Sequence, residues 1–130
     1  MEQKEPFLDA IKTRVLLFDG AMGTEIQKFN PKPEDFPDNK DGFNDGLVLT
    51  HPDWIKQIHR NYLDAGADCI ETNSFGSNKI KLDEYGFGGQ TVEFNKKVAT
   101  LAAEVASEYT DNQRYVIGFN GAFRLSSKFQ

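Results

Sequence analysis

The sequence predicts an α/β fold in which parallel strands alternate with helices. Three observations support this prediction: short apolar runs alternate with longer segments of helical period, the turns from each helix to the next strand are short, and each apolar run ends in polar or glycine residues. The order is strand, helix, strand, helix, strand. These are two βαβ units, which imply a parallel sheet with right-handed crossovers.

The first strand is predicted at residues 15–18, after a helical turn or two at residues 7–13. This apolar run is too short for a helix, so we expect a strand that is buried on both faces. An acid and a glycine-containing turn follow it, formed by Asp19, Gly20, Ala21, Met22 and Gly23. Glycine allows a sharp turn and a close approach to a ligand. A carboxylate beside several backbone N–H groups can hold an ammonium and a carboxylate together, so this turn is a candidate amino-acid site.

A long helix is expected to begin near Thr50, which can cap it, and to end at Gly66. Before it come a short helix at residues 24–28 and a loop at residues 30–46, which has no helical or strand period. Loops of this length are usually functional or mobile. The long helix carries apolar side chains three and four residues apart, at Trp54, Ile55, Ile58, Tyr62 and Leu63.

The second strand is predicted at residues 68–72 and ends in the polar cluster Glu71, Thr72 and Asn73. A short helix at residues 78–85, a turn at 86–89 and a helix at 91–109 follow, before a third strand at 114–118. The last helix has an apolar stripe, made of Val92, Val98, Leu101, Ala102, Val105 and Ala106.

Ligands of parallel α/β sheets gather at the carboxyl ends of the strands, so both polar clusters should line one pocket. Simpler interpretations remain open: Asp19 can cap its turn, Glu71 can be satisfied by a lysine or a backbone amide, and Asn73 can be a turn residue. Cys69 reads as a small buried hydrophobic residue. His51 and His59 read as a surface or capping residue and a packed residue, and not as a zinc pair.

Composition narrows the class of protein. The chain has 130 residues, one cysteine and a formal net charge of −5. This acidity gives no electrostatic case for binding nucleic acid or an anionic membrane surface. No apolar run approaches the roughly 18 residues of a spanning helix, and the first residues lack the pattern of a secretory signal. We therefore expect a soluble cytoplasmic protein.

Four segments together resemble the homocysteine S-methyltransferase family. They are the stretch from Asp19 to Thr24, the pair Asn44-Asp45, and residues 47–52 and 65–76. The details are most similar to the N-terminal homocysteine-binding module of cobalamin-dependent methionine synthase. The resemblance covers about residues 14–118 and implies the first three or so βα units of a (β/α)₈ TIM-type barrel, incomplete in this chain.

The resemblance also implies a function: methyl transfer from methylcobalamin, ultimately from methyltetrahydrofolate, to the sulfur of homocysteine. Asp19 matches the acid that pairs with the homocysteine ammonium, and the backbone of Gly20, Ala21 and Met22 matches the turn that receives the carboxylate. Glu71, Thr72 and Asn73 match the second strand end that lines the pocket.

Zinc and cobalamin are cofactors that the resemblance implies, but the sequence offers no complete site for either. In the family, cysteine thiolates far downstream hold the zinc, and Cys69 matches an apolar position. No catalytic or metal-binding residue is therefore assigned, and the chain is expected to be inactive alone.

Residues 1–118 are expected to form the partial homocysteine-binding barrel domain, and residues 119–130 an atypical tail that lacks the family's glycine-proline segment. Three alternatives stay open: a partial domain that acts only by association with the remaining barrel or other methionine synthase modules, a non-functional gene remnant, and a methyltransferase for a related thiol or selenol.

Overall fold

The structure is a computed structural model that describes residues 4–121. Its sheet is short: β1 (Cys69–Glu71) pairs in parallel with β2 (Tyr115–Ile117), so that Ile70 lies opposite Val116. Phe18 adds a single parallel bridge to Cys69 on the other side of β1. The prediction that three chain segments run parallel is therefore confirmed. In the sheet, the second segment of the chain lies in the middle.

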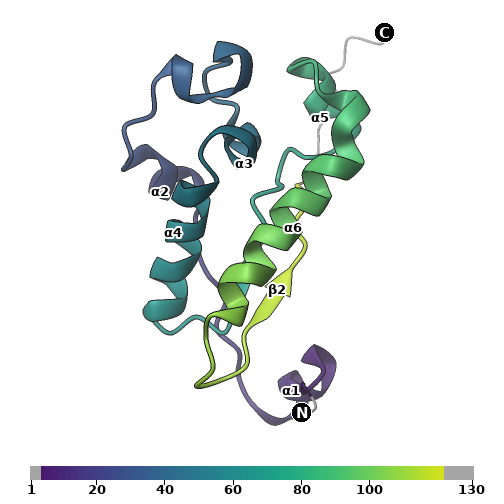
Figure 1. The fold of residues 1–130 in the computed structure, drawn as a ribbon. Helices are drawn as coiled ribbons and strands as arrows, with labels where there is room; N and C mark the ends of the chain where they lie inside the picture. Colours follow the sequence, from purple (N-terminus) through teal and green to yellow (C-terminus); the bar gives the residue numbers. More distant parts are fainter. Residues whose placement is uncertain (1–3, 122–130) are drawn as a thin grey trace, which may run out of the picture.

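Six α-helices are present among the described residues (Figure 1); five were predicted in this order, and α3 was not. Their bounds are α1 Phe7–Thr13, α2 Gly23–Gln27, α3 Leu47–Thr50, α4 Pro52–Asp64, α5 Lys79–Glu84 and α6 Thr91–Ser107. Gly66 ends the turn after α4 with a φ of +107°, in the left-handed region that favours glycine, as predicted.

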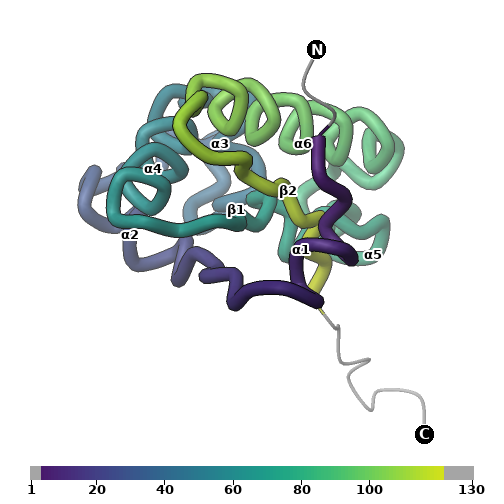
Figure 2. The backbone as a smooth tube through the Cα atoms, turned by 90° about the horizontal axis from the view of Figure 1, so that it is seen from below, coloured from purple at the N-terminus to yellow at the C-terminus, as the bar shows by residue number. Residues whose placement is uncertain are grey.

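Helices cover one face of the sheet, and α1 covers part of the other (Figure 2). On the first face, Ile70 packs in a buried cluster with Leu63 of α4 and Val105 of α6. On the second face, Ala10 of α1 packs against Cys69 and Tyr115. This division follows from the strand period, since successive side chains point to opposite faces.

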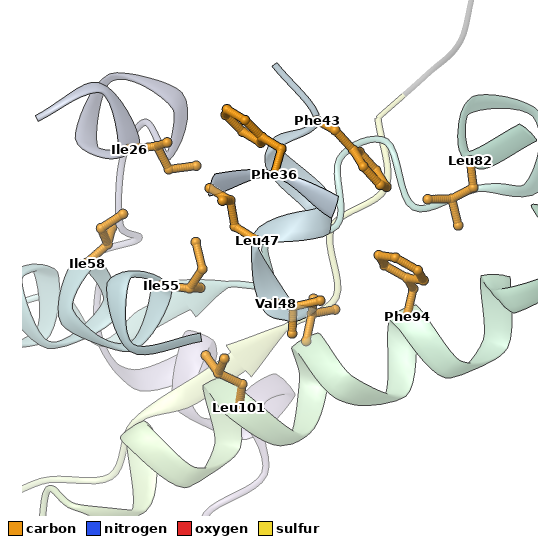
Figure 3. Packing of buried hydrophobic residues seen from close by; sticks show 11 residues of the cluster. Ile26, Phe36, Phe43, Leu47, Val48, Ile55, Ile58, Leu82, Phe94 and Leu101 are labelled. Atoms are coloured by element: carbon orange, nitrogen blue, oxygen red, sulfur yellow. The ribbon is translucent and has the colours of Figure 1, made fainter. Parts of the chain in front are cut away.

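The loop at residues 30–46 is folded into the main core. It contains three turns of 3₁₀ helix, η1 Pro33–Asp35, η2 Pro37–Asn39 and η3 Asn44–Gly46. Its two phenylalanines, Phe36 and Phe43, point into the same cluster as Leu47 and Phe94 (Figure 3). Of the two roles expected for a loop of this length, functional or mobile, apolar burial argues against the mobile one.

The prediction for residues 15–18 is wrong in two respects. Only Phe18 forms a bridge to β1, and Val15 and Leu17 are 85% and 59% exposed. The backbone N–H of Leu17 bonds the Asp68 side chain at 2.9 Å and so does not join a regular ladder. Without a neighbour on its outer side among residues 4–121, the segment cannot be buried on both faces.

Two smaller predictions about helices are also wrong. Thr50 ends α3, and His51, not Thr50, precedes α4, with no side-chain cap bond. Val92 is exposed, while Phe94 takes the buried place at the start of the α6 stripe. Tertiary contacts decide where α4 begins and which residue at the start of α6 is buried, because local sequence preference is compatible with more than one arrangement.

Candidate functional site

A cavity of about 600 Å³ lies where the strands end, and all seven residues predicted to bind substrate line it. These residues are Asp19, Gly20, Ala21, Met22, Glu71, Thr72 and Asn73. The structure therefore brings together two clusters about fifty residues apart in the sequence. Their assignment as substrate contacts stays a prediction, because a shared cavity alone does not identify a ligand.

Asp19 is anchored at the end of its segment by backbone bonds. Its N–H donates to the carbonyl of Cys69 at 2.9 Å, and its two carboxylate oxygens each lie 3.1 Å from the N–H of Glu71. The pKa of Asp19 is raised to about 6, mainly by burial and also by the negative charge of Glu71, against the lowering effect of that N–H bond. A cation placed beside Asp19 would offset both the free-energy cost of burying its charge and its repulsion from Glu71.

Glu71 presents a second carboxylate to the cavity. It shares the strand face of Cys69, opposite to the helix-covered face of Ile70. Within residues 4–121, no lysine and no backbone amide bonds its carboxylate. The simpler interpretation of a satisfied strand-end acid therefore lacks a partner in the described part of the chain.

The turn after Asp19 keeps its backbone donors free. Across residues 4–121, the N–H groups of Gly20, Ala21 and Met22 bond no backbone or side-chain acceptor. Tyr62 of α4 fixes the turn by donating from Oη to the carbonyl of Ala21 at 2.7 Å. A Cβ at Gly20 would lie 3.1 Å from that hydroxyl, so glycine permits this close approach. Three unused donors thus lie beside two carboxylates.

The polar side-chain groups of Thr72 and Asn73 form hydrogen bonds with other residues of the chain. The Thr72 hydroxyl lies 2.6 Å from Ser74 Oγ and accepts from the N–H of Phe119 at 3.0 Å. Asn73 donates from Nδ2 to the carbonyl of Asn44 at 3.1 Å. These two residues line the cavity but also fix its walls.

Sequence reasoning missed the opposite wall of the cavity. This wall comes from the loop before α3 and from α5, and includes Phe43, Asn44, Asp45, Lys81, Glu84 and Tyr85. Phe43 and Tyr85 stack with ring centroids 4.2 Å apart. The pair Asn44-Asp45 was part of the resemblance, so a signal for this wall was present, but nothing local connects that loop with the strand ends.

The described residues do not fit a zinc ion. Between residues 4 and 121, no three histidine, cysteine or acidic side chains form a group that could hold a metal. Cys69 is fully buried, and burial raises the pKa of its thiol, which disfavours the thiolate that zinc requires. His59 is fully buried as a packed residue, and burial lowers its pKa to about 4. His51 is part-exposed and lies 2.9 Å from Asp35.

A family model described as homocysteine S-methyltransferase matches residues 16–126. The chain belongs to this family. It is 40% identical over 116 residues to the methionine synthase of Mycobacterium tuberculosis and 39% identical to that of Mycobacterium leprae. Each alignment covers 88% of this chain and 10% of the relative, so the chain spans about a tenth of the length of these relatives.

Solved structures show the same fold at lower identity. The oxidized form of the homocysteine methyltransferase MmuM from Escherichia coli aligns with a TM-score of 0.74 at 22% identity, over 91% of this chain and 41% of MmuM. Its metallated form aligns with a TM-score of 0.71 at 21% identity, over 88% and 40%. In the described range, no helix is long and apolar enough to cross a membrane.

Proposed function

We propose that this chain supplies the part of a homocysteine S-methyltransferase site that holds the amino-acid end of homocysteine. The observation that carries the proposal is the pairing of two carboxylates, Asp19 and Glu71, with the free N–H groups of the adjoining turn in one cavity. An α-amino acid presents a positive ammonium and a negative carboxylate on one carbon. The cavity offers a complement to each.

The ammonium would lie between Asp19 and Glu71. Two carboxylates near each other and partly buried favour a cation strongly, since it removes their mutual repulsion. Asp19 is held in position by the bonds from the Glu71 N–H, so it needs no reorganisation to receive the ligand.

The carboxylate would accept from the backbone of Gly20, Ala21 and Met22. Backbone N–H groups in successive turn residues form anion-binding concavities. Tyr62 holds this turn through the Ala21 carbonyl, and the N–H groups of the turn bond no acceptor among residues 4–121.

The homocysteine sulfur would then point away from the residues that bind the ammonium and the carboxylate. In the full reaction the methyl group would come from methylcobalamin, ultimately from methyltetrahydrofolate, on other methionine synthase modules. Zinc would activate the sulfur, but the described residues do not fit zinc. We therefore propose that the 130-residue chain binds homocysteine and does not transfer methyl groups alone. Its strands would form the opening units of a (β/α)₈ barrel.

Isothermal titration of the purified chain with L-homocysteine tests the proposal. We expect saturable binding that Asp19→Asn weakens strongly, whereas Asp83→Asn, on the exposed face of α5, leaves it unchanged. Absence of binding by the wild-type chain would refute the proposal. Stoichiometric zinc with turnover of methylcobalamin and homocysteine would refute the claim of inactivity. Titration with selenohomocysteine tests the alternative acceptor.

A second function, association with another chain, is favoured by the exposed apolar side chains of Val15, Leu17 and Phe18. Such an edge is prone to pair with another strand. The partner would be the remainder of the barrel or another methionine synthase module. Light scattering after size exclusion, with Val15→Lys and Leu17→Lys as variants, tests it: a monomer that gains no mass with a separately expressed barrel remainder excludes association.

A further inference from the structure

The turn that follows Asp19 is fixed at both ends by backbone hydrogen bonds. The Asp19 N–H donates to a backbone carbonyl of β1, and the Met22 carbonyl accepts from a backbone N–H of α2, each at 2.9 Å. In the described part of the chain, the middle of the turn has one hydrogen bond to another element, from Tyr62 Oη to the Ala21 carbonyl at 2.7 Å. The orientation of the peptide group between Ala21 and Met22 therefore depends on Tyr62.

The Tyr62 side chain is itself held in place. Its ring packs against both larger core clusters, the one that contains Ile58 and the one that contains Leu63. It also lies so close to the turn that a Cβ at Gly20 would be 3.1 Å from the hydroxyl. The pKa of Tyr62 is raised, mainly by partial burial, so the hydroxyl remains a donor at neutral pH. A rigid support therefore carries this donor.

One planar peptide group connects the Tyr62 bond with an unpaired donor of the turn. The peptide between Ala21 and Met22 is trans, since residues 4–121 contain no cis peptide bond, and its C=O and N–H therefore point in opposite directions. Because the Ala21 carbonyl meets the Tyr62 hydroxyl, the Met22 N–H points to the opposite side. Both residues of this peptide line the cavity. The Met22 N–H, which bonds no acceptor among the described residues, thus has its direction set by Tyr62.

We propose that Tyr62 is a positioning residue, which orients the Met22 N–H toward the carboxylate of the bound amino acid through the Ala21 carbonyl. This inference rests on the proposed function and adds to it a residue that acts without touching the ligand. A donor that is already oriented contributes more to affinity than a mobile one, because it does not have to be ordered on binding. Without the hydroxyl, the peptide group can rotate, and rotation turns the N–H away from the ligand.

Tyr62→Phe tests this role, because it removes the hydroxyl and keeps the ring. We expect titration calorimetry to show about tenfold weaker binding of L-homocysteine, as for a lost hydrogen bond to a charged group. Tyr109→Phe is the matched control: its hydroxyl donates to Asp64 at 2.6 Å, neither residue lines the cavity in the described range, and the affinity should not change.

Amide NMR of the isotope-labelled chain provides a readout that a loss of stability alone would not alter. Saturation with L-homocysteine should move the Met22 amide proton resonance downfield in the wild type, as expected for a new hydrogen bond to a carboxylate. The shift should be clearly smaller in Tyr62→Phe, also measured at saturation, and unchanged in Tyr109→Phe.

Three outcomes would overturn the inference in distinguishable ways. If Tyr62→Phe binds L-homocysteine as tightly as the wild type, the inference is wrong and the proposed function stands. If its affinity falls but the Met22 resonance shifts as in the wild type, Tyr62 has only a structural role, and urea unfolding would show the matching loss of stability. If the wild-type chain does not bind L-homocysteine, the proposed function itself fails, and this inference with it.

Discussion

Two groups of polar residues at the cavity use their hydrogen-bonding groups in opposite ways: the first is Asp19 to Met22 with Glu71, and the second is Thr72 to Ser77. Around Asp19, the backbone donors of the turn and the Glu71 carboxylate have no partner among the described residues. From Thr72 to Ser77, side chains bond the main chain of distant segments and another buried carboxylate. Polar groups that the fold leaves unpaired are available to a ligand, whereas paired ones stabilise the cavity. The same kind of residue therefore serves two purposes.

This difference predicts that substitutions in the two clusters affect different measurements. The largest expected effect belongs to Asp19. Asp19→Asn should weaken L-homocysteine about a hundredfold by removing one partner of a partly buried ion pair. Its free energy of unfolding should not fall, because burial already disfavours the charged form of Asp19. Titration calorimetry measures the affinity, and urea unfolding measures the free energy of unfolding. An unchanged affinity would contradict the assignment of Asp19 to ligand binding.

Ser77→Ala should have the next largest effect, on stability. The Ser77 hydroxyl is buried and donates to the buried Asp45 carboxylate at 2.9 Å. Its loss leaves that carboxylate with one donor fewer and should lower the free energy of unfolding by about 2 kcal/mol. Ser107→Ala, at the exposed end of α6, is the control and should change little. A stable Ser77→Ala protein would show that the second cluster does not hold the cavity wall.

Thr72→Val tests a residue of the second group that lines the cavity. The hydroxyl joins Ser74 to the N–H of Phe119, so its removal should cost about 1 to 2 kcal/mol of unfolding free energy. We expect L-homocysteine affinity to change much less, since Asp19 and the turn are untouched. Thr100→Val, on the exposed face of α6, controls for the change of side chain. A large loss of affinity at unchanged stability would assign Thr72 to the ligand instead.

The smallest effect is a dependence of binding on pH. Because the pKa of Asp19 is raised to about 6, the carboxylate is mostly ionised at pH 7 and mostly protonated at pH 5.5. Binding that needs the ionised form should weaken as pH falls, about fourfold between these two values. Titration at both pH values measures it. Glu71→Gln should retain the weakening but move its midpoint to lower pH, because it removes a charge that raises the pKa of Asp19. Persistence of the weakening in Asp19→Asn would assign it to another group.

Regular elements were predictable because their signals are local. The apolar spacing of α4 and α6 and the short apolar runs of β1 and β2 placed these elements within a few residues of their observed bounds. The burial of residues 15–18 was predicted wrongly, since burial on both faces depends on neighbouring strands and not on the run itself. The burial of Phe36 and Phe43 could not be predicted either, because their partners lie on other elements.

The sequence by itself determined which residues stand at the strand ends, because strand length and the alternation with helices place Asp19 and Glu71 at one edge of a parallel sheet. Only the tertiary structure decided which of the polar groups remain unpaired. Asn73 donates to the carbonyl of Asn44, which is 29 residues away in the sequence. Thr72 accepts from the N–H of Phe119, at a separation of 47 residues. Hydrogen-bond partners at such separations are set by how the elements pack together, and no local pattern in the chain encodes them.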